Sequence, residues 1–374
     1  MIFISLFLAS LVIFRGIFLL SLPKKWKLIF SFLATAVAFK FYILRIFGGR
    51  MFSPELPSWI LLPFAWFFAL LMFWGVWLII CDFARLGKKL YCRWRNKNNF
   101  SGKRESFWRS IGLIPAALLV SIGMYEGLKV PETVEYEVVM PELPPTLEGL
   151  KIAHLSDLHA DPVSGRSKIA RIVELTNRWQ PDLVVITGDF VDGRTAARGR
   201  DLEVLKELHA PLGVFGVPGN HEYYSGYAEW MEFLRTCGIR MLENRHILLK
   251  DGQLALGGVT DIAAIRMNMP YPEVKKTFSG VSENSFRILL AHQPKIAPEA
   301  AAEKVNIQLS GHTHGGMVWG LDLLVAAFNS GRVSGFYDVG EMKLFISNGT
   351  GIWSGFPVRL GRRSEISFLV LKSK

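Results

Sequence analysis

Cysteine is scarce in this chain of 374 residues, which contains only Cys81, Cys92 and Cys237. Cys237 alone lies beyond residue 129, so the C-terminal part cannot form an internal disulfide bond. The cysteine count does not decide whether the chain works in a reducing or an oxidising compartment.

Acidic side chains are scarce in residues 1–129, where 4 Asp/Glu stand against 17 Lys/Arg, for a formal charge of +13. Of the 43 basic and 32 acidic residues of the chain, 26 and 28 remain for residues 130–374, whose charge is −2. The overall charge of +11 therefore belongs to the N-terminal part. It is typical of segments that flank a membrane and argues against a nucleic-acid-binding surface on the C-terminal part.

Long apolar runs are plentiful in the N-terminal part, in a chain that is 50% hydrophobic with 27 Phe and 11 Trp. Four runs approach the roughly 20 residues that a transmembrane helix needs: residues 1–22, 27–47, 58–83 and 108–128. The first lacks a basic start and a small-residue cleavage site, so we expect a membrane helix and not a signal peptide. The second contains Lys40 and Arg45, of which Arg45 lies near one end and can extend to the interface.

Basic loops give this predicted bundle an orientation. The first loop contains three lysines between residues 24 and 27, and the third contains nine Lys/Arg between residues 85 and 109 beside one acid, Glu105. The second loop has only Arg50 and Glu55. Because basic loops stay in the cytoplasm, we expect a multi-pass protein of the plasma (inner) membrane with everything after residue 128 on the outer, periplasmic face.

The N-terminal bundle is either a plain anchor or a structure that forms a lipid-facing groove or binds a partner, and Lys40 is the one hint of a polar site within it. Residues 129–147 are predicted to be a tether. They contain a strand-like run over Val134–Met140 and then three prolines, at positions 141, 144 and 145, which stiffen the connection.

Short apolar strands and amphipathic helices alternate from residue 148 to 374, with strands dominating late, which indicates an α/β domain of two stacked sheets flanked by helices. The expected strands cover 150–155, 182–187, 213–217, 247–250, 254–259, 286–291, 305–309, 343–347 and 366–371, and the expected helices 167–179, 202–208 and 228–236.

Five segments rich in metal-ligating side chains follow the predicted strands: Asp157-Leu-His159, Gly188-Asp189-Phe-Val-Asp192, Gly219-Asn220-His221-Glu222, His292, and Gly311-His312-Thr-His314. Ligands of open α/β sheets bind beyond the carboxyl ends of strands, so we expect these segments to converge on one site. One such segment alone carries little weight, whereas five in order predict a centre for two divalent metals.

The residue types in these segments indicate which metal each side chain would bind. Asp157, His159, Asp189 and His314 are expected to hold a first metal, and Asn220, His292 and His312 a second, with Asp189 bridging the two about 3.5–4 Å apart. Oxygen and imidazole ligands without thiolate favour Mn, Fe or Zn.

The same segments supply the expected chemistry. A hydroxide that bridges the two metals attacks phosphorus, and His221 donates a proton to the leaving group. Asp192 and Glu222 are predicted to orient imidazoles or coordinating waters from behind. Gly188, Gly219 and Gly311 are expected to permit tight bends beside the ligands.

These segments resemble the calcineurin-like metallophosphoesterase superfamily, whose pattern is D-x-H, G-D-x-x-D, G-N-H-[DE], H and G-H-x-H. The resemblance covers roughly residues 148–374 and extends, through Gly-Asn-His-Glu-Tyr-Tyr and the tail Gly349–Leu360, to a bacterial phosphodiesterase-like branch whose members include membrane-anchored proteins and relatives acting on lipid-linked phosphates. It implies a four-layer α/β/β/α sandwich and two metals. Met317 departs from the polar residue expected there, which puts the substrate contacts in doubt.

Three functions follow. The first is a membrane-anchored phosphoesterase acting on a phosphodiester or pyrophosphate, including a lipid-linked one. The second is a tethered phosphatase or nucleotide phosphodiesterase on soluble substrates, and the third a non-catalytic metal-binding membrane module. The sequence identifies neither the substrate nor a protein partner.

Several polar residues stay outside these assignments. His154, His209 and His246 match no motif and are expected to be structural or exposed. Near the tail lie Asn348, Trp353, Arg359, Arg362 and Arg363, whose arginines are interpreted as phosphate-binding, as merely exposed, or as contacts to lipid headgroups.

Overall fold

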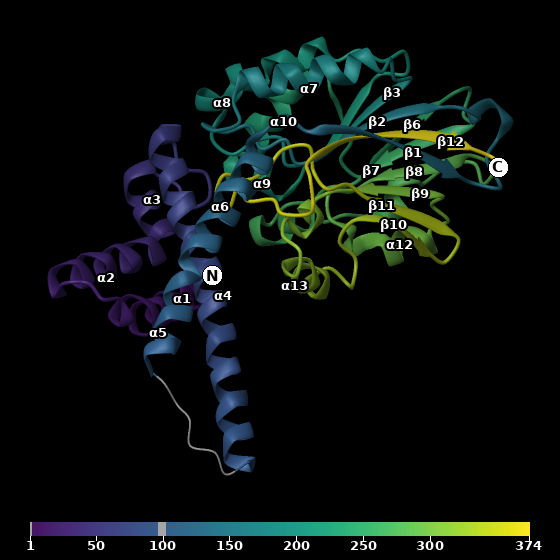
Figure 1. Ribbon diagram of the computed structural model, residues 1–374. Helices are drawn as coiled ribbons and strands as arrows, with labels where there is room; N and C mark the ends of the chain where they lie inside the picture. The colour runs from purple at the N-terminus through teal and green to yellow at the C-terminus, as the bar shows by residue number, and fades with distance from the viewer. Residues whose placement is uncertain (1, 96–101) are drawn as a thin grey trace. The chain divides into compact units, whose positions relative to one another are not determined.

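The computed structural model describes residues 2–95 and 102–374, apart from the side chains of 102–105, and divides the chain into two compact units, Met1–Tyr125 and Glu126–Lys374 (Figure 1). Part of the basic third loop, on which the predicted orientation depends, lies outside the described residues.

Helices make up the N-terminal unit: α1 (Ile2–Leu11), a π-helical turn and a 3-10 turn (Val12–Gly16, Ile17–Leu19), α2 (Lys24–Ala38), α3 (Lys40–Gly48), α4 (Ser58–Trp94), α5 (Gly102–Ile111) and α6 (Leu113–Leu128). Over the described residues, three stretches are long and apolar enough to span a membrane: Ile2–Leu19, Ser58–Trp94 and Ser106–Leu128. The predicted second span is divided between α2 and α3, which are bent by 69°, so there are four spans only if this pair crosses as one.

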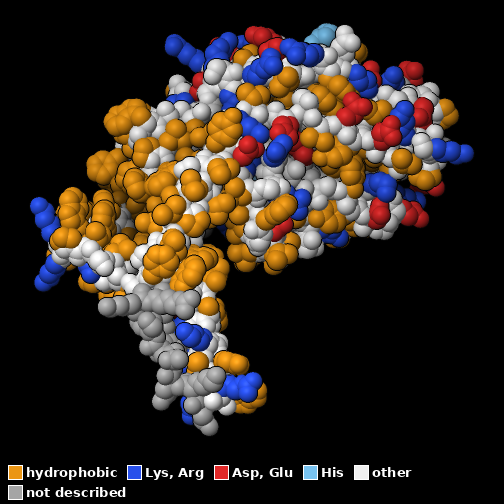
Figure 2. All heavy atoms as spheres, in the orientation of Figure 1, with side chains coloured by type: hydrophobic (Ala, Val, Ile, Leu, Met, Phe, Trp, Pro, Cys, Tyr) orange, Lys and Arg blue, Asp and Glu red, His pale blue; other side chains and the backbone are white. Residues whose placement is uncertain are grey.

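Hydrophobic side chains cover much of the surface of these helices (Figure 2), as expected for segments in contact with lipid. The unit also contains a polar cluster that the sequence did not predict. Arg109 is buried and donates a hydrogen bond to Asp82, and Arg15 lies 3.9 Å from the same carboxylate. Lys40 is likewise buried, 5.3 and 5.2 Å from the ring centres of Phe41 and Phe68.

Two six-stranded mixed sheets form the C-terminal unit. The first has the order β1 (Glu132–Val139), β12 (Glu365–Lys372), β2 (Lys151–Leu155), β3 (Leu183–Thr187), β4 (Val214–Val217), β5 (Arg240–Met241). The second has the order β10 (Gly335–Val339), β11 (Met342–Ile346), β9 (Ile307–Ser310), β8 (Phe286–Leu290), β7 (Leu254–Gly258), β6 (Arg245–Leu249).

The sheets stack on a shared apolar core to which Ile152, Phe215 and Ile288 contribute, and the central strands β3 and β7 are buried on both faces. This explains why they read as continuous apolar runs. Helices α7 (Arg166–Arg178) and α10 (Tyr227–Thr236) cover the outer face of the first sheet, while α11 (Val274–Thr277) and α12 (Ala297–Ala302) pack on the second.

Two segments differ from their predicted structure. The strand-like run in the predicted tether forms β1, which pairs in parallel with β12 from Glu132↔Glu365 onward and closes one edge of the first sheet. The predicted helix 202–208 is replaced by α8 (Thr195–Leu202) and a 3-10 turn over Glu203–Glu207. Further short helices are α9 (Asn220–Ser225), α13 (Leu321–Phe328) and 3-10 turns at Pro145–Leu147, Ile262–Met267, Pro294–Ile296 and His314–Gly316.

Candidate metal centre

The five motif segments meet at the carboxyl ends of five strands. The motif carrying Asp157 follows β2, and those carrying Asp189, Asn220, His292 and His312 follow β3, β4, β8 and β9. The first three strands are neighbours in one sheet and the last two in the other, so the site lies where the edges of both sheets meet. All seven predicted ligands are brought together there.

One group of ligand atoms is formed by Asp157, His159 and His314. His159 Nε2 lies 3.1 Å from His314 Nε2 and 3.9 Å from Asp157 Oδ1, and His314 Nε2 lies 3.5 Å from the same oxygen. The ligand atoms of these three side chains lie within 4.8 Å of one another, so a single divalent cation could be held by all three.

A second group is formed by Asp189, His292 and His312. His292 Nε2 lies 3.2 Å from Asp189 Oδ2, 3.1 Å from Asn220 Oδ1 and 3.2 Å from His312 Nδ1. Its other nitrogen donates to the carbonyl of Thr187 at 2.7 Å, which directs Nε2 into the centre. A histidine ligand is commonly held by its second ring nitrogen in this way.

Asp189 lies between the groups, because its Oδ2 is also 3.7 Å from His159 Nε2. Burial opposes ionisation, but the charges of His292 and His221 hold the pKa of this carboxyl well below its usual range. A carboxylate shared by two imidazole clusters, with an amide oxygen and no thiolate among the ligand groups of the described residues, is a donor set that fits hard or borderline divalent cations.

The ligand loops have an uncommon backbone. Asp157, His159, Asp189, His312 and His314 all have φ between 47° and 72°. Such left-handed conformations are costly for non-glycine residues and persist where the surrounding structure imposes them, typically at functional sites.

Close approach explains two of the motif glycines. At Gly188 (φ 81°) a Cβ atom would lie 2.5 Å from the backbone nitrogen of Gly219. At Gly311 it would lie 1.8 Å from the Ser156 hydroxyl and 2.3 Å from Asp157 Oδ2. Any side chain at either position would push the ligand loops apart.

Asp192 connects two imidazoles. One of its oxygens lies 3.0 Å from His159 Nδ1 and the other is in short contact with His221 Nδ1. Burial opposes the charged form of His221, yet Asp189 and Asp192 raise its pKa to about 10. The His221 side chain is 15% exposed, while Asp192 behind it is buried.

Glu222 contacts the backbone of the ligand loops. Its carboxylate accepts hydrogen bonds from the backbone N–H groups of Asp189, Phe190 and Gly219, at 2.9, 2.8 and 2.6 Å. These bonds hold the ends of β3 and β4 together. Glu222 thus shapes the ligand loops through their backbone, whereas Asp192 contacts two imidazoles.

The tail residues are mostly structural. Arg359 is 1% exposed and donates to the carbonyls of Asn348, Gly351 and His314 at 2.7, 2.9 and 3.2 Å. Asn348 donates to Glu365 and accepts from Ser334, Arg362 pairs with Asp322 at 3.4 Å, and Arg363 pairs with Glu132 at 2.7 Å. Arg359 thus fixes the loop behind His314, facing backbone carbonyls.

The unassigned histidines lie outside the ligand groups. His154 is buried beside Thr187 Oγ1 at 2.7 Å, and burial lowers its pKa to about 3. His246 Nδ1 donates to the carbonyl of Thr277, and His209 is exposed. Two aromatic rings near the site carried no signal for this role in the sequence: Tyr224 and Trp353 lie 5.5 and 6.3 Å from the His221 ring.

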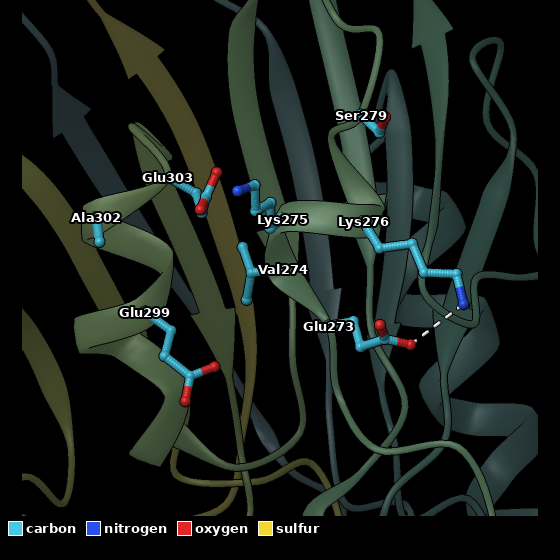
Figure 3. A pocket seen from close by; sticks show the side chains of 8 residues that line it. All are labelled: Glu273, Val274, Lys275, Lys276, Ser279, Glu299, Ala302 and Glu303. Carbon is cyan, nitrogen blue, oxygen red and sulfur yellow. Dashed lines mark hydrogen bonds and ion pairs between the residues drawn. The ribbon is translucent and has the colours of Figure 1, made fainter.

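A separate surface pocket of about 640 Å³ lies between α11 and α12. Figure 3 shows that its lining mixes basic and acidic side chains, with an ion pair between Lys276 and Glu273 at 3.1 Å. None of the predicted site residues lines it, so it offers no alternative catalytic site.

Metal binding is expected to displace protons. Without metal, burial would lower the pKa of His292 and His159, but Asp189 raises the first and Asp192 the second. Protonated imidazoles cannot coordinate, so the affinity for Mn²⁺ should rise with pH and binding should release protons. Calorimetry in buffers of different ionisation enthalpy measures this release, which Asp192→Asn should reduce. Equal heats in all buffers at pH 7 would contradict the prediction.

Arg359→Met should destabilise the unit. The change leaves the carbonyls of Asn348, Gly351 and His314 without their donor, and an unpaired buried acceptor costs about 1–3 kcal/mol, so we expect about 3 kcal/mol or more in total. The thermal unfolding midpoint of detergent-solubilised protein should fall clearly. Arg178→Met, whose side chain is 66% exposed, is the control and should change little. Equal midpoints for the two variants would refute a structural role.

Comparison with known proteins finds sequence relatives of this chain. A family model described as "Calcineurin-like phosphoesterase" matches residues 150–316. The chain is 34% identical over 316 residues to "Transmembrane protein with metallophosphoesterase domain" of Danio rerio, covering 80% of this chain and 72% of that protein. It is 33% identical over 278 residues to the Bos taurus protein of the same name, covering 71% of this chain and 62% of the relative. Among solved structures, a 5'-nucleotidase precursor from Thermus thermophilus is 15% identical with a TM-score of 0.39, over 59% of this chain and 54% of that one.

Proposed function

Since this chain belongs to the family of calcineurin-like phosphoesterases and is thus a metal-dependent hydrolase, we propose that it is a membrane-anchored phosphodiesterase or pyrophosphatase with a two-metal centre. The observation that carries the proposal is the pair of ligand groups on either side of Asp189, with His221 beside them. In this proposal Asp157, His159, Asp189 and His314 hold one ion, and Asp189, Asn220, His292 and His312 the other. When bound, two divalent ions supply a hydroxide nucleophile at neutral pH and neutralise charge on the phosphoryl oxygens.

The chain's own contribution to leaving-group departure is His221. Asp192 holds its Nδ1, so Nε2 presents the proton, and that nitrogen lies 3.9 Å from the shared carboxylate Asp189. Bound cations would lower its pKa from about 10 towards neutrality, where a general acid is most useful. His221 is therefore the proposed donor to the leaving oxygen.

A diester or pyrophosphate is the proposed substrate because its leaving group carries a further substituent, which can contact side chains beside His221. Tyr224 and Trp353 line the His221 side with aromatic rings and suit an apolar or planar leaving group. The candidate spans in the same chain support the choice of a lipid-linked substrate.

Turnover of bis-p-nitrophenyl phosphate and of p-nitrophenyl phosphate by full-length protein, chelated and then refilled with Mn²⁺, tests the proposal. Diester turnover that disappears on chelation and returns with metal would support it. Turnover of the monoester alone would make the protein a phosphatase. Protein that binds both metals and hydrolyses neither compound would favour a non-catalytic metal-binding module.

We also propose that the catalytic unit lies on the outer, periplasmic face, as the basic loops predict. Fusion of alkaline phosphatase or of green fluorescent protein after Lys374 tests this in bacterial cells, because the phosphatase is active only outside and the fluorescent protein folds in the cytoplasm. A fluorescent fusion together with an inactive phosphatase fusion would show that the catalytic unit lies in the cytoplasm and would contradict the proposed orientation.

A further inference from the structure

Helix α13 is apolar, yet none of its side chains is buried in a hydrophobic core. Seven of its eight residues, Leu321–Phe328, are apolar, and none of the eight is buried. Leu323, Leu324 and Phe328 are 75%, 53% and 70% exposed, and Trp319 just before the helix is 72% exposed. Figure 2 shows hydrophobic side chains at the surface over this segment. A continuous patch of large apolar side chains on a folded domain marks an interaction surface.

Hydrogen bonds and close packing connect this patch to the loops beside the metal centre. The backbone N–H of Trp319 donates to the carbonyl of Leu360 at 3.1 Å, and Asp322, the only polar residue of the helix, pairs with Arg362. A Cβ atom on Gly316, two residues after the ligand His314, would lie 2.5 Å from the Asp322 Cα atom. Helix α13 starts beyond residue 316, where the match to the family model ends.

The tail segment that contains Pro357 and Leu360 also lies beside the point where the chain enters the catalytic unit. Glu126–Leu128, the last turn of the candidate span Ser106–Leu128, belongs to this unit, and β1 begins soon after Leu128, at Glu132. A Cβ atom on Gly127 would lie 2.6 Å from the carbonyl oxygen of Pro357. The tail thus contacts the end of a span at Pro357 and pairs with Val318 at Leu360, beside α13.

We propose that α13 and Trp319 form a lipid-docking surface that lies in the interfacial layer of the membrane in which the chain is anchored. The connection of three residues keeps the start of β1 within about 14 Å of the end of the span, since each of the four steps from Leu128 to Glu132 covers about 3.3–3.6 Å. A bilayer surface is therefore the partner that this face meets at the highest local concentration.

The chemistry of the patch fits an interfacial helix. Leucine and phenylalanine side chains enter the boundary between headgroups and acyl chains, while tryptophan prefers the headgroup level. Asp322 is already paired with Arg362, and Arg332 follows the helix closely in the sequence and adds positive charge, which suits anionic phospholipids. Docking through α13 would hold the metal centre at the depth of lipid phosphates, which deepens the proposed function and rests on it only for the choice of substrate.

Spin-label accessibility in full-length protein tests the docking without any assay of activity. The label is placed by Leu323→Cys in nanodiscs of phosphatidylcholine and phosphatidylglycerol, on a background in which Cys81, Cys92 and Cys237 are replaced by alanine. The control is Leu248→Cys, because Leu248 is also an exposed apolar residue (50%) of the catalytic unit, on β6 at the edge of the second sheet opposite β10. We expect oxygen, which concentrates in lipid, to relax the label at 323 and a water-soluble nickel reagent to relax the label at 248.

A label at 323 that is reached mainly by the nickel reagent would overturn the proposal. One that is shielded from both reagents would also overturn it, because it would indicate protein cover by a second copy or by another chain. Both outcomes are independent of catalysis: a docked label in a protein that hydrolyses no phosphoester would refute the proposed function and leave the docking intact.

A second test compares Leu323→Glu/Phe328→Glu with Leu248→Glu, each carrying a spin label introduced by Leu324→Cys. Withdrawing one large side chain from lipid changes an equilibrium roughly tenfold, so the ratio of docked to undocked protein should fall at least tenfold in the double variant. The label should then move from oxygen to the nickel reagent, while Leu248→Glu leaves it in lipid. Unchanged label accessibility in the double variant would overturn the proposal.

Discussion

Asp189→Asn should abolish phosphoester hydrolysis and weaken the binding of both metals. Asparagine keeps one oxygen, which can still accept the backbone N–H of His221 as Asp189 Oδ1 does at 2.8 Å. It loses the negative charge and the second oxygen, which lies 3.2 Å from His292 and 3.7 Å from His159. Loss of a group that merely supports a ligand costs about 10–100-fold, so loss of the shared ligand should exceed about 100-fold.

Metal content after gel filtration, measured by mass spectrometry beside diester turnover, checks this result. Asp251→Asn is the matched control, because Asp251 is exposed in a turn at φ 54°, a conformation that asparagine tolerates well. A variant of Asp189 that retains both ions and near-normal turnover would contradict the shared-ligand assignment.

His221→Ala should lose activity and keep its metals. General acid catalysis contributes about 10²–10⁴-fold, and the loss should depend on the leaving group. A nitrophenolate leaves readily without a proton, whereas an alkoxide needs one, so diesters with alkyl leaving groups should suffer most. Steady-state rates over a series of leaving groups, with metal content measured on the same samples, check this prediction.

His209→Ala serves as the control for this variant, since His209 is exposed and its backbone nitrogen, which the substitution keeps, donates to Asn177 at 3.0 Å. A uniform loss over all leaving groups together with loss of one metal would show that His221 is a ligand. That alternative is real, because His221 also lies in a ligand group with His159 and Asp189.

These side chains could be picked out in the sequence because they follow buried strands, which appear there as short continuous apolar runs. Strands such as β3 are apolar on both faces, and the polar residue that ends each one is conspicuous, as Asp189 is after Thr187. Parallel neighbours then bring these ends to one edge without further information. The roles of Asp192 and Glu222 could not be separated in this way, because the partner of a buried carboxylate depends on the side chain's direction in three dimensions.

Three other features of the fold could not be predicted from the sequence, each for a physical reason. The strand β1 is half exposed, and its polar alternation after a candidate span is typical of a linker until its pairing with β12 is known. The apolar run of α13 resembles a buried helix in periodicity, and only burial shows that it lies at the surface. The break between α2 and α3 follows a residue, Phe39, that carries no breaker signal. The orientation of the bundle and the identity of the metals stay predictions.

Asp192 connects the proposed metal site to the proposed general acid. The same carboxylate holds His159, a proposed ligand, and His221, the proposed acid, one on each oxygen. A cation held by His159 would withdraw electron density from that imidazole and strengthen its contact with Asp192, which would change the proton affinity of His221 as well. Catalytic competence would then not grow in proportion to the metal supplied. A protein that holds one ion would then have a His221 whose proton affinity is not adjusted for donation to the leaving group.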